Sequence, residues 1–178
     1  MSDEREQVNS PDPVRGMGRG MLWIFWLGIL AGGTWFFSGG EDRREHPNRN
    51  PESRVTDTFA EVRLESNRAG HYLADGYLDG QAVTFLLDTG ATAVVIPGDV
   101  ADRIGLARGQ RIPVQTASGR DHAFLTRIDS LELGSISLRN VDGAIAPGLE
   151  NTVLLGMSAL SRMEMNQRDG ILILTHRH

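Results

Sequence analysis

One carboxylate, Asp88, stands between two apolar runs of the sequence, Phe85–Leu87 before it and Val94–Ile96 after it. Thr89 and Gly90 follow it directly, so the first run leads the acid into a tight turn. A charge between two strand-like segments is costly to bury unless it is paired or hydrogen-bonded. A rigidly held carboxylate can act as a general base on water, and a protonated one beside it can act as the acid. The turn therefore favours a catalytic aspartate, and the alternative is a turn aspartate that caps its own loop.

The sequence contains a single Asp-Thr-Gly, because the other Asp-Thr pair, Asp57-Thr58, is not followed by glycine. Two carboxylates about 3 Å apart share one proton and titrate as a unit. One chain cannot supply both from this motif, but a two-fold homodimer can, with Asp88 of each copy meeting on the axis. Gly90 would allow a second backbone to approach, and the Thr89 hydroxyl could bond across the axis. Such chemistry needs no metal or cofactor, and we expect none.

Short strands and tight turns are the elements that would position this turn. Glycine is abundant, with 21 residues, and aromatic residues make up only 6% of the chain. Asp79-Gly80 and Asp169-Gly170 are two-residue hairpin signals. Val100–Ile104 followed by glycine indicates a short helix, and residues 157–163 indicate one or two more helical turns. We therefore predict an all-β domain over residues 59–178 with one or two short helices.

A family resemblance emerges from these stretches. Phe85–Ile96 resembles the active-site loop of the retropepsin-like (clan AA) aspartic proteases. Val153–Met157 is similar to the apolar-apolar-Gly element that precedes their short C-terminal helix. The span 70–173 looks like the bacterial membrane-anchored members, which carry one N-terminal helix before such a domain. The resemblance implies a retropepsin-like closed β-barrel and a homodimeric endopeptidase that acts on proteins or peptides.

The site residues that the resemblance implies fall into four roles. The hairpin near residue 118 lies where the family has a substrate-covering flap, although an ordinary β-turn is the alternative there. Thr92 departs from the retroviral pattern, which often has Asp at this position, and its hydroxyl could bond the outer oxygen of Asp88. The expected residues are the catalytic Asp88; Thr89, Gly90, Ala91 and Thr92 in support of its loop; Leu155 and Gly156 behind it; and Thr116, Ala117, Ser118 and Gly119 in the flap.

Several other chemistries are disfavoured by composition and spacing. The chain has no cysteine, which excludes disulfides and thiolate metal sites. His71 and His122 lack a third ligand at metal spacing. Ser158 and Ser161 lack the His–Asp arrangement that would indicate a nucleophile. The net charge is −5 and the basic residues are dispersed, so we expect no nucleic-acid partner.

The N-terminal part contains an uncharged apolar run at residues 20–37. Its length reaches the lower bound for a membrane-spanning helix, which is about 17–25 residues. We predict a transmembrane signal anchor there, preceded by a disordered tail at 1–19 and followed by a flexible linker at 38–58. A cleaved signal peptide is the alternative, since Ala31-Gly32-Gly33 offers small residues, but the apolar run continues past them.

The sequence leaves alternatives open for the orientation of the predicted span in the membrane and for the function of the domain. Arg15 and Arg19 precede the run while Arg43 and Arg44 follow it, so charge does not decide the orientation. A short tail inside and the domain outside is the simpler translocation, and it would place the domain in the periplasm of a Gram-negative cell, on the inner membrane. The rival function is a membrane-tethered binding or scaffold module that kept the fold without turnover. A third option is a protease that trims only its own tether.

Overall fold

A computed structural model describes residues 45–116 and 119–177 of the chain. The predicted tail at 1–19, the predicted span at 20–37 and the first part of the predicted linker lie outside the described residues. Within the described ranges, neither helix has the length and apolar character needed to cross a membrane.

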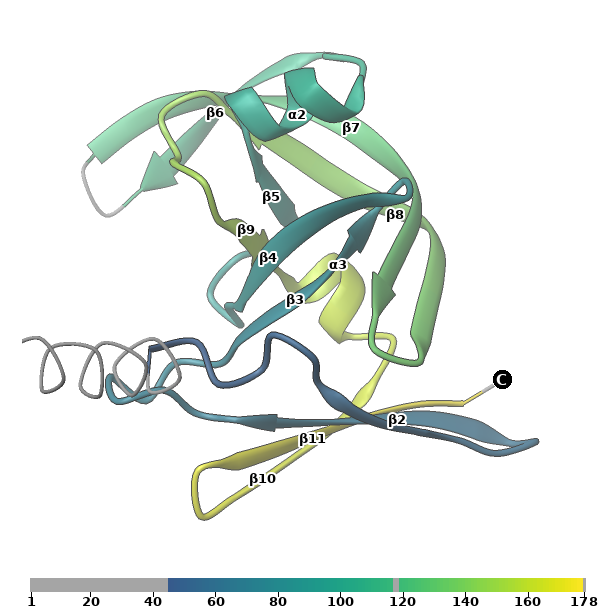
Figure 1. The fold of residues 1–178 in the computed structure, drawn as a ribbon. Coiled ribbons are helices and arrows are strands. Elements are labelled where there is room, and N and C mark those ends of the chain that lie inside the picture. The colour runs from purple at the N-terminus through teal and green to yellow at the C-terminus, as the bar shows by residue number, and fades with distance from the viewer. Residues whose placement is uncertain (1–44, 117–118, 178) are drawn as a thin grey trace, which may run out of the picture. The chain divides into compact units, whose positions relative to one another are not determined.

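A closed β-barrel forms the larger part of this structure (Figure 1). The sheet that forms it has seven strands: β3 (Leu73–Leu78), β4 (Gln81–Leu87), β5 (Val94–Pro97), β6 (Arg111–Thr116), β7 (Gly119–Leu133), β8 (Ile136–Ala146) and β9 (Val153–Leu155). Their order in the sheet is β3-β4-β9-β5-β8-β7-β6. Because β3 also pairs with β7, with Tyr77 opposite Glu132, six strands close on themselves and β6 stays outside the ring.

The remaining strands form a second sheet beside the barrel. They are β1 (Glu52–Val55), β2 (Phe59–Glu65), β10 (Glu164–Arg168) and β11 (Ile171–Arg177). The order is β1-β2-β11-β10 and every pair is antiparallel. Buried residues alternate with more accessible ones along β2 and β11, so one face of these strands packs into the core.

Both predicted two-residue hairpin turns are confirmed. Asp79 and Gly80 have φ values of 47° and 76°, and Asp169 and Gly170 have 50° and 76°. Positive φ at both central residues is what a type I′ turn requires, and Asp-Gly adopts it readily. The turns join β3 to β4 and β10 to β11, which fixes the register of both hairpins.

Among the described residues, two short helices complete the fold, α2 (Gly98–Ile104) and α3 (Met157–Leu160). The C-terminal stop predicted at Gly105 is present, with φ of 76° in the left-handed region. An all-β fold with a closed barrel and two short helices is thus confirmed.

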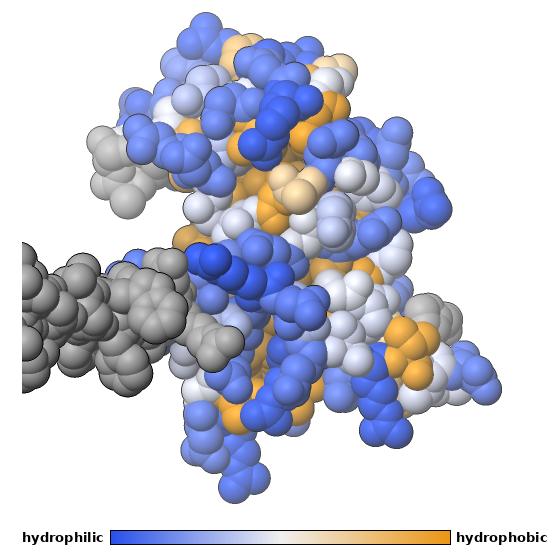
Figure 2. Space-filling model, in the orientation of Figure 1, coloured by the Kyte–Doolittle hydropathy of each residue, from blue (hydrophilic) through white to orange (hydrophobic). Residues whose placement is uncertain are grey.

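An apolar core lies inside the barrel and between the two sheets. Figure 2 shows that the face seen in Figure 1 is mostly hydrophilic, with apolar residues in small separate patches. The largest fully buried side chains come from both sheets and from α3: Phe85, Leu64, Leu78, Ile96, Ile128, Leu131, Leu133, Ile136, Ile145, Leu155, Leu160 and Leu174.

The folded part of the chain begins earlier than the predicted Phe59. Part of the predicted linker 38–58 forms β1, which pairs with β2 along its whole length. Upstream of β1, Asn48 is buried and forms an isolated bridge with Ala74 of β3. The polar, proline-containing composition of this stretch suggested a tether, but its backbone supplies a sheet edge instead.

Two strand boundaries also differ from expectation. The strand expected from Gly70 begins at Leu73, because Gly70 has φ of 79° and lies in a turn closed by its N–H bond to the Asn67 carbonyl. The separate strands expected on either side of Asp129 are one long strand, β7, which pairs with β8 through most of its length. A long continuous strand lets β7 serve both the barrel and the hairpin with β6.

Candidate active site

The candidate acid, Asp88, follows the last residue of β4. β4 runs parallel to β9, with Leu87 opposite Leu155, and the N–H of Asp88 donates to the carbonyl oxygen of Leu155 at 3.1 Å. β9 also lies against β5, where Val95 is opposite Leu154. One buried strand thus fixes both the strand that enters the loop and the strand that leaves it.

Within the loop, backbone amides hold Asp88. The Gly90 N–H donates to Oδ1 of Asp88 at 2.8 Å, and the Ala91 N–H donates to its carbonyl oxygen at 3.2 Å. Oδ2 has no hydrogen-bond partner among the described residues. Asp88 is half-buried, whereas Thr89 and Thr92 are exposed. The loop therefore orients one carboxylate oxygen and leaves the other for a water or a second carboxylate.

Gly156 lies directly behind this loop, where no larger residue fits. A Cβ there would lie 2.7 Å from the carbonyl oxygen of Ala91 and closer still to that of Ala93. Both contacts are with backbone, which cannot rotate away as a side chain could. The next residue, Met157, donates its N–H to the Ala91 carbonyl at 2.8 Å. The chain from β9 into α3 therefore packs against the loop backbone to backbone.

Ser158, which showed no sign of being a nucleophile, holds the exit of the loop. Its N–H donates to the Thr92 carbonyl at 3.0 Å. Its Oγ accepts the Val94 N–H at 3.0 Å and donates to the Asp142 carbonyl at 2.7 Å. Sequence reasoning missed this role because these two partners lie 64 and 16 positions away, and no local pattern marks them.

The Thr92 hydroxyl, which the sequence suggested as a partner for the outer oxygen of Asp88, does not reach it within one chain. In the part of the chain that the structure describes, neither the Thr89 nor the Thr92 hydroxyl hydrogen-bonds to Asp88. Thr92 contributes through its backbone, whose carbonyl accepts the Ser158 N–H. Thr89 and Thr92 are both exposed.

The hairpin of β6 and β7 stands at the predicted flap position. Thr116 and Gly119 pair at its end, and Gly119 has φ of 124°, which favours glycine. Ala117 and Ser118 lie outside the described residues. Figure 1 shows the hairpin extending beyond the barrel, as expected for a strand, β6, that pairs with β7 alone. Its role as a cover over the site stays a prediction.

Charged groups away from the loop form exposed ion pairs. Hydrogen bonding to Arg108 lowers the pKa of Asp102, and hydrogen bonding to Arg177 lowers the pKa of Glu164. Within the described ranges, no three His, Asp or Glu side chains cluster as metal ligands would. The chemistry that the described loop offers is that of a positioned carboxylate.

Comparison with known proteins addresses the family. A family model described as gag-polyprotein putative aspartyl protease matches residues 74–162, half of the chain. The match runs from β3 through Asp88 and the β6–β7 hairpin to α3. The chain belongs to the retropepsin-like aspartic protease family. Asp88 lies within the matched residues of this protease-family chain.

One solved structure shares the fold, and two curated proteins are similar in sequence. A retropepsin-like aspartic protease from Rickettsia conorii has the same fold, with a TM-score of 0.58 and 23% identity over 72% of this chain and 96% of that one. An uncharacterized Sinorhizobium protein from the cobV 5′ region is 34% identical over 111 residues, which is 60% of this chain and 48% of that protein. The uncharacterized Rickettsia prowazekii protein RP867 is 23% identical over 127 residues, 70% of this chain and 54% of that protein. This retropepsin-like chain spans about half the length of the curated relatives it matches.

Proposed function

We propose that the chain is a membrane-anchored aspartic endopeptidase that works as a homodimer, with Asp88 of each copy forming the catalytic pair. One observation carries this proposal. Asp88 follows a barrel strand on a loop that β9 and α3 hold from behind, while the Thr89 side of the loop is exposed. A loop that β9 and α3 hold on one side and that is exposed on the other can contact the same loop of a second copy.

The second carboxylate must come from another copy, because this chain has one Asp-Thr-Gly. When two Asp88 side chains meet, they share a proton, since two adjacent charges cannot both persist. The ionised carboxylate takes a proton from a bound water as that water attacks the peptide carbonyl carbon. The protonated carboxylate donates to the carbonyl oxygen, and a proton then passes to the leaving nitrogen as the C–N bond breaks.

The exposed residues of the loop fit a two-fold contact. Gly90 has no side chain to hold the copies apart, and a Cβ there would lie 3.1 Å from Oδ1 of Asp88. The Thr89 hydroxyl makes no hydrogen bond within the described part of its own chain and can bond across the axis. A closed two-fold arrangement would therefore bury polar groups that one chain leaves in solvent.

The anchor rests on the sequence alone, through the uncharged run at 20–37. With the short N-terminal tail inside, the folded unit would stand in the periplasm and act on proteins or peptides near the inner membrane. Tethering would also raise the effective concentration of one copy for another, which favours a dimer.

A matched pair of aspartate variants tests the catalytic assignment. The full-length protein in detergent is incubated with a peptide library, and the new N-termini are quantified by mass spectrometry. Asp88→Asn should lose at least about 100-fold in cleavage, the scale of general acid–base catalysis. Asp57→Asn changes the exposed Asp-Thr pair and should cleave as the wild type does. Undiminished cleavage by Asp88→Asn would refute the assignment. Equal peptide binding without turnover by either form would instead indicate the tethered binding module.

A further inference from the structure

The segment around Asn48, just before β1, is built into the fold. Asn48 is 5% exposed and is the one polar residue in the buried class among those described. Its Nδ2 donates to the carbonyl oxygens of Glu65 at 2.9 Å and Leu73 at 2.7 Å, and its Oδ1 accepts the Glu65 N–H at 2.7 Å. Its own carbonyl accepts the Asp75 N–H at 3.1 Å. Four backbone groups from two distant strands thus depend on one asparagine.

These contacts fill a gap in the barrel. β3 pairs with β4 along its whole length, but on its other edge it pairs with β7 only at Tyr77 and Leu78. The edge at Leu73–Asp75 would otherwise have no neighbour, and the Asn48 backbone occupies it through the bridge to Ala74. Because Asn48 also holds Glu65 at the end of β2, the same residue joins the barrel to the four-stranded sheet.

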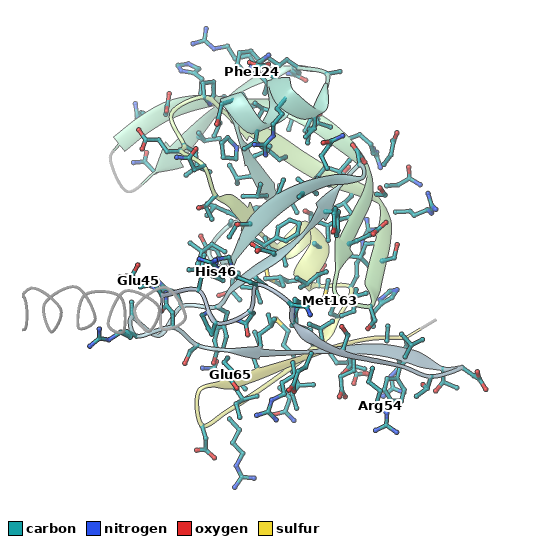
Figure 3. All side chains as sticks on the ribbon, viewed as in Figure 1. Glu45, His46, Arg54, Glu65, Phe124 and Met163 are labelled. Carbon is teal, nitrogen blue, oxygen red and sulfur yellow. The ribbon has the colours of Figure 1, made fainter. Side chains whose placement is uncertain are left out.

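Flanking residues extend this attachment toward the N-terminus. His46 Nε2 lies 3.3 Å from Oδ1 of Asp75, the same oxygen that accepts the Thr84 hydroxyl at 2.7 Å. Upstream of it, the carbonyl of Glu45 accepts the Asn67 side chain at 3.4 Å. Figure 3 shows His46 against the barrel and Glu65 on the sheet below it. We call residues 45–48 the clasp.

The clasp lies one strand away from the strand that presents the catalytic acid. Leu73, whose carbonyl Asn48 binds, is opposite Leu86 on β4. The next residue of β4, Leu87, donates its N–H to the Tyr72 carbonyl at 3.0 Å and precedes Asp88. Loss of the clasp would release the edge of β3 next to the hydrogen bonds that fix the entry to the loop.

We propose that the clasp is an integral part of the protease, so that the position of a cut decides the fate of the released domain. A cut before Glu45 leaves the clasp in place and yields a folded, active domain. A cut between Asn48 and β1 removes it and inactivates the enzyme. In either case hydrolysis consumes one water and leaves a new carboxylate and a new amine. The statement about activity rests on the proposed function, whereas the statement about folding does not.

The clasp also takes up part of the predicted linker. With the clasp inside the folded unit, the part of the predicted linker 38–58 that lies upstream of the clasp is residues 38–44. A processing protease, including a second copy of this chain, therefore has one short window in which release preserves the enzyme. Cleavage downstream of that window would be a shut-off step.

Two insertion variants of the full-length chain test the clasp. Each carries the recognition sequence of a site-specific protease, one between Gly39 and Gly40 and the other between Asn50 and Pro51. The uncut form of each variant is its own control. After cutting and dilution, amide hydrogen exchange is followed at Glu65 and Asp75, whose N–H groups donate to Asn48.

The early cut should leave exchange at both amides and peptide cleavage unchanged. The late cut should speed exchange at both amides by at least about tenfold, the scale of a lost buried hydrogen bond, and should abolish peptide cleavage. Unchanged exchange after the late cut would overturn the proposal. If exchange responds as expected while the uncut protein shows no cleavage, the clasp stands and the proposed function fails.

Point variants test the clasp without an insertion, in case an insertion prevents folding. Asn48→Asp is nearly isosteric but replaces the donating amide with a carboxylate that faces the Glu65 and Leu73 carbonyls. It should speed exchange at Glu65 and Asp75 in the uncut chain. Asn50→Asp makes the same change at an exposed position and should leave both amides as in the wild type. Equal exchange in the two variants would contradict the clasp.

Discussion

The chain contains two Asp-Thr pairs, and the structure supports them in different ways. Asp57-Thr58 lies in the turn between β1 and β2, which closes on itself. The Thr56 Oγ1 accepts the Phe59 N–H at 3.2 Å, and the Thr56 N–H donates to the Phe59 carbonyl at 2.9 Å. The turn at Asp88 is held instead by β9 and α3, from distant parts of the sequence.

The difference shows that the same residue pair can be held by its own turn or by distant parts of the fold. The hydrogen bonds that the structure describes for the Asp57-Thr58 turn join Thr56, Thr58 and Phe59 to one another. The loop after β4 has local bonds too, and in addition its backbone is fixed against a buried strand and a helix. Variants of the two regions should therefore differ in the size of their effects and also in the property that changes. Changes near Asp88 should alter both stability and cleavage, and changes in the Asp57-Thr58 turn should alter stability alone.

Gly156→Ala should have the largest effect, because its methyl group would collide with the carbonyls of Ala91 and Ala93. We expect a loss of about 3 kcal/mol or more in the free energy of unfolding, measured by urea denaturation, together with loss of cleavage. Gly148→Ala is the matched control, since its nearest neighbour is a side-chain oxygen of Asp121 at 3.1 Å, which can rotate. Its stability should stay within about 0.5 kcal/mol of the wild type. Equal losses in the two variants would contradict backbone-to-backbone packing at Gly156.

Ser158→Ala should rank next. It leaves the Val94 N–H and the Asp142 carbonyl without their partner, which we expect to cost about 1–3 kcal/mol in the free energy of unfolding. Because Val94 is where the chain leaves the loop, kcat should fall while KM changes little. Ser161→Ala, at an exposed position after α3, should alter neither quantity. Wild-type kcat in Ser158→Ala would show that this hydroxyl does not position the loop.

Thr56→Ala weakens the self-closed turn in the same way and sharpens the contrast. It removes the hydroxyl that accepts the Phe59 N–H, so we expect a cost of about 1 kcal/mol. Peptide cleavage measured at a temperature well below unfolding should not change. A fall in kcat comparable to that of Ser158→Ala would mean that the two regions are not independent.

Of these variants, Asp102→Asn should have the smallest effect, and that effect should be seen only at acidic pH. Hydrogen bonding to Arg108, six positions away, lowers the pKa of Asp102 in the folded state. A lowered pKa gives a stabilising contribution that is present above the ordinary pKa and is lost as the pH falls below about 4. The melting temperature of the variant should therefore fall less steeply between pH 6 and pH 3 than that of the wild type. The difference should be small, because the variant lacks only about one titrating charge. Identical slopes would show that this exposed pair contributes nothing.

Local sequence signals, such as turn residues and helix stops, predicted most of the fold. Asp-Gly at 79–80 and 169–170 specified its own turns, and Gly105 ended α2 because its preference for positive φ is intrinsic. The site was partly predictable, since Asp88 and Gly156 carry local signals in their apolar surroundings. Ser158 and Asn48 could not be found in this way. Their partners are backbone groups that only the closed barrel brings near. In the sequence, a side-chain amide that will be buried in a polar stretch cannot be told from a solvated one.

The central claim, that Asp88 acts as a pair supplied by two copies, is tested most directly by mixing. Wild-type and Asp88→Asn chains with different tags are co-expressed in equal amounts, and the cleavage rate of the total pool is compared with that of an equal amount of wild-type protein. If each active site needs two Asp88 carboxylates, random pairing leaves about one quarter of the wild-type rate. A rate of about one half would mean that each chain works alone and would contradict the shared pair.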